Sequence, residues 1–182
     1  MRLFVAVWPT DQVRDRLAEA IEALLTDELR WVKPENWHVT LAFLGSVPDD
    51  ELDALVAVLR SIQSQALRCD AALGTHTSTI GRSVLCLPTS GLDELAGAVR
   101  ESTGPFSRAP DRDRPFAGHL TLARTRRGRA VPGLAVGRPI SALGIGAPVS
   151  MTWPVSEVRL VASEEGREGT EYSPQAFVAL AE

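Results

Sequence analysis

Two histidines open the same five-residue pattern, His-x-Thr-Leu-Ala, once at His38 and again at His119. Each copy is rich in aliphatic and β-branched residues and follows turn-forming residues, so each is predicted to be a β-strand. Side chains alternate between the faces of a strand, which puts His38 and Thr40 on one face, and His119 and Thr121 likewise. We therefore expect the two strands to bring two imidazoles and two hydroxyls to a shared cleft.

The paired histidines suit acid–base chemistry at a phosphorus atom. An imidazole titrates near pH 6.5, so at neutral pH one ring can be neutral while the other is protonated. One could activate water while the other protonates the departing oxygen, and each role typically contributes about 10²–10⁴-fold in rate. The hydroxyls of Thr40 and Thr121 could donate hydrogen bonds to phosphoryl oxygens as charge develops. This chemistry requires no metal and no cofactor.

Three other interpretations of the histidines are weaker. A lone histidine beside an aliphatic strand is more often a hydrogen-bonded core residue, but a core role gives no reason for the same threonine offset in both copies. A catalytic zinc usually takes three protein ligands; Glu35 precedes His38, yet nothing equivalent precedes His119. A nucleophile triad is disfavoured because there is no Gly-x-Ser-x-Gly sequence and no catalytic cysteine context.

The charge distribution points to a small anionic ligand. The net charge of −4 argues against a general nucleic-acid coat protein. However, no Asp or Glu occurs between Arg114 and Ser156. A discrete anionic ligand fits this pattern better than a long polyanion, although a solvated arginine-rich loop explains it equally well. The arginine cluster comprises Arg114, Arg124, Arg126, Arg127, Arg129 and Arg138.

The length and composition are those of an ordinary globular protein. The chain has 182 residues, 45% of them hydrophobic and 23% charged, which suits one domain or two small lobes sharing a core. Cys69 and Cys86 match no metal-ligand spacing and are interpreted as free thiols in a reducing compartment. The apolar run at the N-terminus is too short for a signal peptide, and no run approaches the length of a membrane span. We expect a cytoplasmic protein.

The residue patterns predict an α+β fold. Several expected strands are separated by short turns, which favours antiparallel pairing. Residues 30–36 are expected to be a connector and residues 164–169 a charged turn, while residues 126–137 leave little room for a long helix. Helices are expected at residues 10–25, 48–62 and 92–102, and strands at residues 3–8, 37–44, 67–73, 83–88, 116–124, 140–145, 155–162 and 176–180.

A few other side chains are candidates for binding. The third histidine, His76, has no repeat partner, so a surface or structural role is favoured for it. Trp31, Trp37 and Phe43 could stack on a base of single-stranded RNA. For Phe43 core packing is the preferred interpretation, and for Trp37 packing and stacking are equally open.

The two motif regions resemble a known family. The chain is similar to the RNA 2′,3′-cyclic phosphodiesterases of the two-histidine (2H) phosphoesterase superfamily, which are 2′-5′ RNA ligase-like proteins. The doubled His-x-Thr-Leu is the specific part of this resemblance, which spans nearly the whole chain. The similar segments are residues 30–45 and 114–124, the opening strand at 1–9 and the closing strands at 158–163 and 169–172.

The resemblance implies a fold as well as a reaction. The fold is one bilobal domain over residues 1–182, with pseudo-symmetric lobes of mainly antiparallel sheet around a central cleft and helices outside. Each lobe contributes one motif, residues 38–41 and residues 119–122. The implied reaction is hydrolysis of a terminal 2′,3′-cyclic phosphate on RNA to a 2′-phosphate, without a metal. We expect a monomer that binds RNA or a related nucleotide and no membrane.

In the family's scheme the two histidines have different roles. His38 is the proton donor to the leaving 3′ oxygen, and His119 is the proton acceptor that activates water. The phosphate is bound by Thr40, Thr121 and Arg124.

Some questions stay open at the level of the sequence. Gly118 stands where the family usually has proline, and glycine is expected to loosen the entry into the second motif strand. The same site could instead support 2′-5′ joining of RNA ends or hydrolysis of a small cyclic nucleotide. A nucleotide-binding module without turnover is a third alternative, which the intact histidines and threonines of both motifs disfavour.

Overall fold

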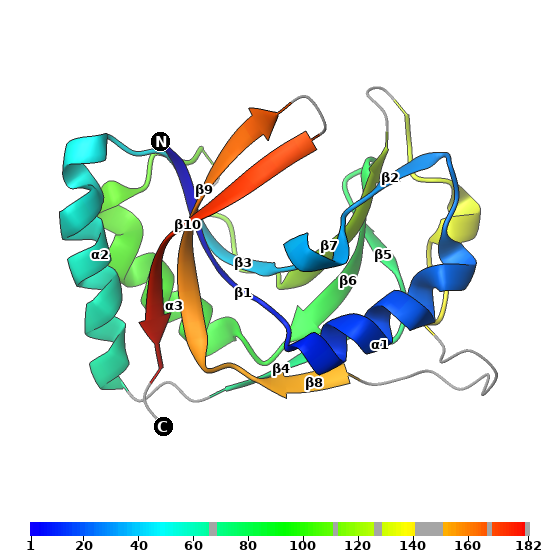
Figure 1. Cartoon of the computed structure of the whole chain (residues 1–182), viewed down its shortest axis with the longest axis horizontal. Coiled ribbons are helices and arrows are strands. Elements are labelled where there is room, and N and C mark those ends of the chain that lie inside the picture. The colour runs from blue at the N-terminus through cyan, green and yellow to red at the C-terminus, as the bar shows by residue number, and fades with distance from the viewer. Residues whose placement is uncertain (66–68, 111–112, 126–128, 141–150, 167–168, 181–182) are drawn as a thin grey trace.

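Ten strands form one antiparallel sheet in the part of the chain that the structure describes. The computed structural model describes residues 1–65, 69–110, 113–125, 129–140, 151–166 and 169–180. The strands are β1 (Arg2–Val7), β2 (Leu29–Trp31), β3 (Val39–Ser46), β4 (Asp70–Leu73), β5 (Ser78–Ile80), β6 (Val84–Ser90), β7 (His119–Thr125), β8 (Met151–Pro154), β9 (Glu157–Gly166) and β10 (Gly169–Ala179). Their order is β10-β9-β1-β3-β7-β6-β4-β8, with β2 beside β7 and β5 beside β6. The sheet curls into an open half-barrel (Figure 1).

The sheet has two halves that meet at strands β3 and β7. The first half consists of β10, β9, β1 and β3, and the second half consists of β7, β6, β4 and β8 with the short strands β2 and β5. The pair Val39 and Leu120 joins β3 to β7. These two residues directly follow His38 and His119, so the joint between the halves coincides with the two sequence motifs.

Three α-helices occur in the described part of the chain: α1 (Asp11–Ile21), α2 (Leu52–Ser61) and α3 (Asp93–Thr103). Thr10 caps α1, because its hydroxyl accepts a hydrogen bond from the backbone N–H of Val13 at 3.4 Å. Helices α2 and α3 lie against the first half of the sheet, and α1 lies beside β8 (Figure 1). All three expected helices are confirmed. None of the described helices is long and apolar enough to cross a membrane.

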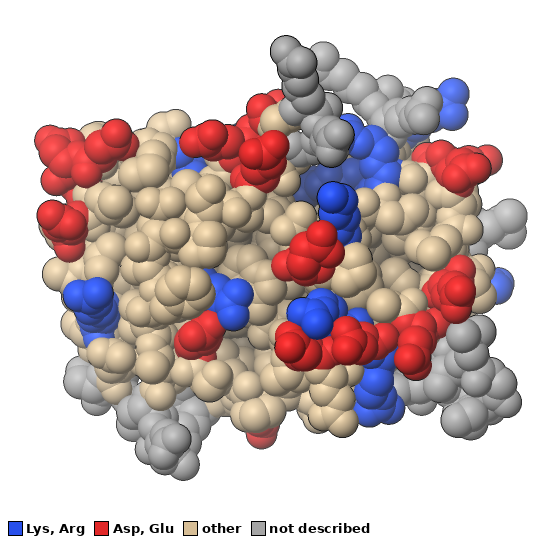
Figure 2. All heavy atoms as spheres, in the orientation of Figure 1, with Lys and Arg blue, Asp and Glu red and all other residues tan. Residues whose placement is uncertain are grey.

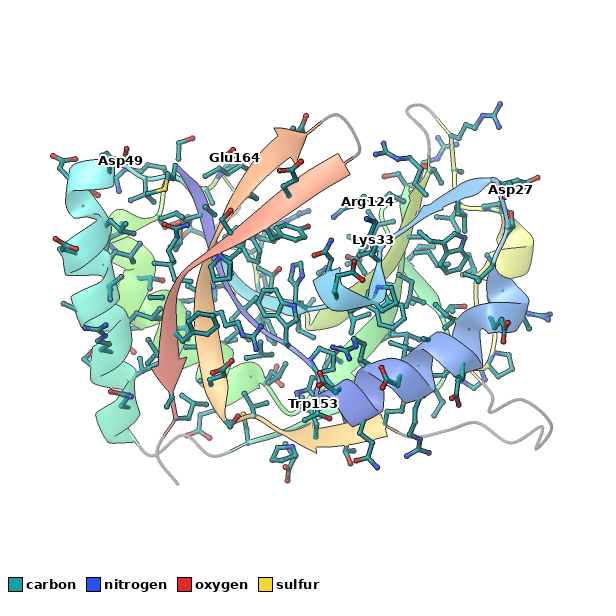
Figure 3. The ribbon with its side chains drawn as sticks, in the orientation of Figure 1. Asp27, Lys33, Asp49, Arg124, Trp153 and Glu164 are labelled. Carbon is teal, nitrogen blue, oxygen red and sulfur yellow. The ribbon has the colours of Figure 1, made fainter. Side chains whose placement is uncertain are left out.

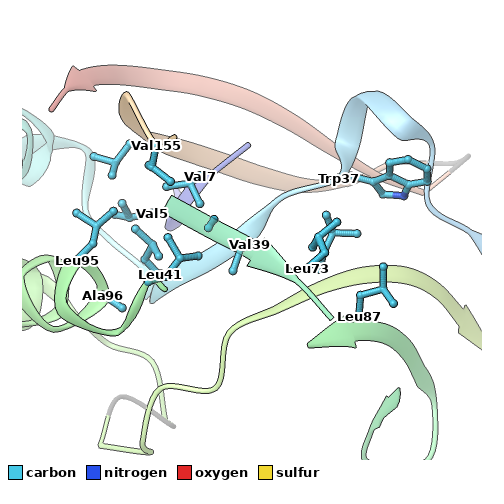
Figure 4. Packing of buried hydrophobic residues seen from close by; sticks show 14 of the residues in the cluster. Val5, Val7, Trp37, Val39, Leu41, Leu73, Leu87, Leu95, Ala96 and Val155 are labelled. Atoms are coloured by element: carbon cyan, nitrogen blue, oxygen red, sulfur yellow. The ribbon is translucent and has the colours of Figure 1, made fainter. Parts of the chain in front are cut away.

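Strand β1 is buried on both faces. Leu3, Val5 and Val7 point into the main core, where they pack with residues of β3 and α3 (Figure 4). Phe4 and Ala6 point to the other face, where they belong to a small separate cluster. A strand covered on both sides needs apolar residues at successive positions. This requirement accounts for the continuous apolar run over residues 3–7 of β1.

Three short strands were not predicted from the sequence. Strand β2 occupies the start of the segment expected to be a connector, and β5 and β8 were not expected at all. Each has only three or four residues, too few to establish an alternating pattern. The charged turn expected at residues 164–169 is too long, because β9 extends to Gly166 and β10 begins at Gly169; residues 167–168 lie outside the described part of the chain. Most of the strand expected at residues 140–145 lies outside the described residues.

Gly118 enters β7 in close contact with β6. Its carbonyl oxygen accepts a hydrogen bond from the backbone N–H of Thr89 at 2.8 Å. A Cβ atom on Gly118 would lie 2.5 Å from the carbonyl oxygen of Thr89, closer than real Cβ atoms approach. Tight backbone packing, rather than a looser entry, therefore accounts for glycine at this position.

We predict that Gly118→Ala lowers the free energy of unfolding by about 1–3 kcal/mol, as overpacking typically does. The added methyl group must push β7 away from β6. Urea unfolding monitored by circular dichroism measures the change. The matched control is Gly97→Ala in α3, where a Cβ meets nothing within 4 Å; it should raise stability by about 0.5–1 kcal/mol, because alanine is the better helix former. Equal effects of the two substitutions would contradict the packing argument.

Candidate active site

His38 and His119 are tethered in the same way. His38 lies two residues after a short 3₁₀ turn, Pro34–Asn36, and its Nδ1 donates to the carbonyl oxygen of Asn36 at 2.7 Å. His119 is the first residue of β7, and its Nδ1 donates to the carbonyl oxygen of Ala117 at 2.8 Å. A carbonyl oxygen can only accept, so each Nδ1 carries a proton and each neutral ring has its lone pair on Nε2. Nε2 is therefore the atom of each ring that can accept or donate a proton.

The pairing of Val39 with Leu120 brings the two motifs together. Both side chains are fully buried, at 0% exposure, and point into the core. The four polar motif side chains therefore project from the opposite face of the sheet. Cβ atoms lie about 4.5–5.5 Å apart across such a ladder and about 7–8 Å apart on the diagonal. The two histidines lie on one diagonal and the two threonines on the other, with His38 opposite Thr121 and His119 opposite Thr40.

An aromatic sandwich encloses the imidazole of His38. Phe4 and Trp8 lie on the same face of the first strand and its extension, and Ala6 between them has only a methyl group. The His38 ring centroid lies 5.0 Å from that of Phe4 and 4.9 Å from that of Trp8, with interplanar angles of 29° and 30°. Tyr172 of β10 meets the imidazole edge-on, with centroids 5.2 Å apart. The imidazole thus occupies the gap above Ala6.

Trp8 is itself held in place from two sides. Its Nε1 donates to the carbonyl oxygen of Glu35 at 3.3 Å, in the turn that precedes His38. The guanidinium of Arg159 lies 4.9 Å from the centroid of the Trp8 ring, and its Nε donates to a carboxylate oxygen of Glu157 at 2.7 Å. These contacts hold the Trp8 ring, the outer wall of the sandwich, against the imidazole.

Burial lowers the pKa of His38 from 6.5 to about 4. Removing the ring from water disfavours its charged form. The hydrogen bond to Asn36 opposes this effect, while the charges of Arg124 and His119 add to it. In the protein alone, His38 is therefore neutral at neutral pH.

A β-bulge turns Arg124 onto the face that carries the histidines. In β7 one extra residue, Leu122, interrupts the pairing with β6. The alternation of side chains between the two faces of β7 restarts after Leu122, so Arg124 shares a face with Thr121. Its charge lowers the pKa of His38 and opposes the rise that burial causes in the pKa of Tyr172, in agreement with this position. Arg124 lies between the two halves of the sheet (Figure 3).

Positive charge accumulates beside the histidines. Arg30 of β2 lies directly opposite Arg124 in the ladder, and like charges in that arrangement destabilise a sheet. Within the described residues, neither arginine has a salt-bridge partner. Lys33 also lies between the halves (Figure 3), and Figure 2 shows Lys and Arg atoms in a hollow there. This uncompensated charge suits an anionic ligand.

The structure separates the other binding candidates. Trp37 is only 2% exposed, so it is a core residue and not a stacking surface. Phe43 is 51% exposed, so the expected core packing of Phe43 is wrong. Trp31 is half-buried. His76 is exposed, with its Nδ1 bonded to the Thr75 hydroxyl at 2.9 Å, which confirms the surface role.

Several residues around the histidines were not predicted from the sequence. Phe4, Trp8 and Tyr172 surround His38, and only the alternation of positions 4, 6 and 8 in the apolar first strand could have indicated two of them. Arg30 was assigned to a connector because a three-residue strand leaves no pattern. Within the predicted arginine cluster, residues 126 and 127 lie outside the described part of the chain.

The site offers groups for a phosphate and no metal cluster. In the part of the chain that the structure describes, no group of three or more His, Cys, Asp or Glu side chains could hold a metal ion. Within the same described residues, the hydroxyls of Thr40 and Thr121 have no hydrogen-bond partner in the protein. Cys69 and Cys86 are free thiols, and burial raises the pKa of Cys86 to about 11.

Solved structures share this fold. A protein from Thermus thermophilus superposes with a TM-score of 0.81 at 27% identity, over 99% of this chain and 98% of the other. Escherichia coli LigT, in a crystal structure with 3′-AMP, gives a TM-score of 0.77 at 27% identity, over 100% of this chain and 98% of the other. The curled sheet and its paired histidines thus define a phosphoesterase of the two-histidine class, which confirms the expected fold.

Sequence comparison identifies the family within that class. Residues 7–73 match the model described as LigT like Phosphoesterase. An RNA 2′,3′-cyclic phosphodiesterase of Archaeoglobus fulgidus is 30% identical over 132 residues, covering 70% of this chain and 74% of the relative. The chain belongs to the LigT-like phosphoesterase family, and the resemblance inferred from its motifs is confirmed.

The depressed pKa of His38 predicts a loss of stability in mild acid. Below pH 6.5 the unfolded chain protonates His38, whereas the folded protein does so only near pH 4. The free energy of unfolding should therefore fall by on the order of 3 kcal/mol as the pH drops from about 6.5 to about 4. In His38→Phe, which keeps a ring in the sandwich, this part of the pH dependence should disappear in urea unfolding experiments. His76→Phe, an exposed control, should keep it. Full pH dependence in His38→Phe would refute the burial argument.

Proposed function

We propose that this protein hydrolyses 2′,3′-cyclic phosphate ends of RNA to 2′-phosphomonoesters, using two histidines and no metal. One observation carries the proposal: two imidazoles with the same Nδ1 tether lie on one face of the β3–β7 joint. The name of the Archaeoglobus relative and the 3′-AMP complex of E. coli LigT support a nucleotide substrate. All the residues involved come from one chain, so the proposed site needs no second copy.

The reaction is an in-line displacement at phosphorus. Water forms a new P–O bond while the bond from phosphorus to the 3′ oxygen breaks. Nε2 of His119 takes a proton from the water, and Nε2 of His38 gives a proton to the 3′ oxygen. Each transfer typically contributes about 10²–10⁴-fold in rate.

The other three residues bind the phosphate. The hydroxyls of Thr40 and Thr121 donate to its non-bridging oxygens, where negative charge grows in the transition state. Arg124 adds a charge-assisted hydrogen bond, which is roughly twice as strong as a neutral one. Because these donors are fixed on strands, they need little rearrangement as the reaction proceeds.

The proton donor must be charged when the substrate is bound. In the protein alone, the pKa of His38 is about 4, so the ring is neutral at neutral pH. A phosphodiester anion placed beside the ring favours the imidazolium and raises this pKa. Substrate binding therefore protonates the donor. Transfer of that proton to the 3′ oxygen leaves His38 neutral, the form that the aromatic sandwich favours, and His119 then releases the proton that it took from water.

We expect His38→Ala and His119→Ala each to reduce kcat at least 100-fold with a short oligoribonucleotide that ends in a 2′,3′-cyclic phosphate. The double variant should be little worse than either single one, because the two groups act as a unit. EDTA should leave the rate unchanged, and His76→Ala is the matched control. Loss of activity in EDTA that zinc restores would contradict the proposal. Faster turnover of 2′,3′-cyclic mononucleotides than of the oligonucleotide would redirect it to small cyclic nucleotides.

Binding of the product should take up a proton at His38. Calorimetric titration with 2′-AMP at pH 5.5, in buffers of different ionisation enthalpy, measures the protons taken up. The wild-type protein should take up as much as one proton more than His38→Gln, because the pKa of His38 rises from about 4 when the phosphate binds. No difference would mean that His38 stays neutral, and the donor and acceptor roles of the two histidines would then be exchanged.

A further inference from the structure

A stack of five flat groups crosses the first half of the sheet and includes His38. The guanidinium of Arg159 lies 5.3 Å from the centroid of the Phe177 ring and 4.9 Å from that of the Trp8 ring. The Trp8 ring in turn lies 4.9 Å from the imidazole of His38, which stacks on Phe4 at 5.0 Å. The side chain of a charged residue on β9 is therefore separated from the imidazole by a single ring.

The strand register explains why these groups meet. Arg159 of β9 pairs with Ala6 of β1, and on its other edge Ala6 pairs with Thr40 of β3, just before the ladder skips Leu41. Strands β9 and β3 thus flank β1 on opposite edges. Trp8 follows Ala6 by two residues, so its ring projects from the same face of the sheet. Arg159 and the histidine before β3 therefore reach this ring from opposite sides.

The Trp8 ring has little else to hold it. Trp8 lies beyond the end of β1 at Val7 and is half-buried. Pro9, the next residue, restricts the backbone of Trp8 to an extended conformation but leaves its side chain free to rotate. The hydrogen bond from its Nε1 to Glu35 is 3.3 Å long, beyond the usual range of about 2.7–3.2 Å. The packing of its outer face against Arg159 is therefore its main support.

Arg159 is well suited to support a ring. Its Nε donates to a carboxylate oxygen of Glu157 at 2.7 Å, and Glu157 lies two residues earlier on the same face of β9. This bond fixes the plane of the guanidinium, and Phe177 covers its other side. A planar, weakly hydrated guanidinium stacks on an aromatic face in a way that a lysine ammonium does not.

We propose that Arg159 is a positioning residue for His38, which clamps Trp8 against the imidazole and keeps the ring enclosed. Arg159 acts through the position of Trp8 and does not touch the substrate. The inference rests on the proposed function only for its effect on the reaction, since the enclosure of His38 can be measured without substrate.

The charged groups that face His38 lie on other elements than β9. Strand β7 presents Arg124 and His119, whose charges lower the pKa of His38. Strand β10 presents Tyr172, whose phenol stays neutral at neutral pH because burial raises its pKa. The turn before His38 presents the carbonyl oxygen of Asn36, and β1 contributes only apolar rings to the sandwich. Desolvation is the largest cause of the low pKa of His38, so the ring responds mainly to how well its walls close.

The test follows the ionisation of His38 by proton NMR of the imidazole signals. In the wild-type protein the His38 signal should stay that of a neutral ring between about pH 5 and pH 8. In Arg159→Ala the Trp8 ring loses its support and water reaches the imidazole, so the pKa should rise from about 4 toward 6.5. A tenfold or larger change in the ionisation constant is expected, with the exposed His76 as internal reference. An unchanged His38 titration in Arg159→Ala would overturn the proposal.

Two further variants separate the clamp from the charge of Arg159. Trp8→Leu should raise the pKa of His38 by itself, and adding Arg159→Ala should then change nothing more, because the arginine acts through Trp8. Arg159→Lys keeps the charge but lacks the planar group that Glu157 holds, so it should titrate like Arg159→Ala. Additive effects in the double variant, or a wild-type titration in Arg159→Lys, would overturn the clamp.

The matched control is Arg14→Ala. Arg14 of α1 is also half-buried and ion-paired, with Asp11 at 2.8 Å, but it contacts no ring of the sandwich in the described part of the chain. This variant should leave the titration of His38 as in the wild-type protein.

The effect on the reaction is read from the pH dependence of kcat/KM, which reports ionisation in the free protein. With the cyclic-phosphate oligonucleotide, the acid limb should move to higher pH in Arg159→Ala, because both imidazoles are then protonated at a higher pH and no proton acceptor remains. An unmoved acid limb in an active variant with a shifted titration would overturn the role of Arg159 in the reaction. If the wild-type protein hydrolyses no such substrate, the proposed function fails, and the NMR titration alone decides whether the clamp exists.

Discussion

The site depends on one buried residue pair, Val39 with Leu120. Their burial fixes which face of each strand looks into the core, and the histidines and threonines on either side must then face outward together. A slip of one residue in either strand would put a bare imidazole into the core and an aliphatic side chain into the site. The variable position inside each His-x-Thr motif is thus the residue that sets the geometry of the others.

Two identical tethers give unequal histidines because their surroundings differ. Strand β1 supplies Phe4 and Trp8 as walls around His38, while in the described part of the chain no aromatic ring packs against His119. The walls withdraw His38 from water and disfavour its charged form. A donor and an acceptor can therefore arise from the same sequence pattern, since the difference lies in the neighbouring strand and not in the motif.

The sequence was most informative where a pattern repeats. The two motifs indicated the strands, the shared face and the family, and helix periodicity located all three helices. The sequence did not indicate the short strands β2, β5 and β8. The burial of Phe43 was misjudged, and that of Trp37 was left open. The error at Phe43 arises because strict alternation cannot anticipate a bulge: after Leu41 the faces exchange, and Phe43 turns outward. Tyr172 reaches His38 from a strand that is distant in the sequence, so no pattern around either residue indicates their contact.

The position of β1 also has a consequence for the order of folding. This strand lies between β3 and β9, so one of its edges pairs with residues that leave the ribosome early and the other with residues that leave it late. Until β9 and β10 emerge, one edge of β1 has unpaired backbone groups, and Tyr172 has not reached His38. Folding should be slow for a chain of this size, because such distant contacts must close before the sheet is complete. The nascent chain therefore carries both histidines and the two stacking rings of Phe4 and Trp8, but not Tyr172, which completes the surroundings of His38.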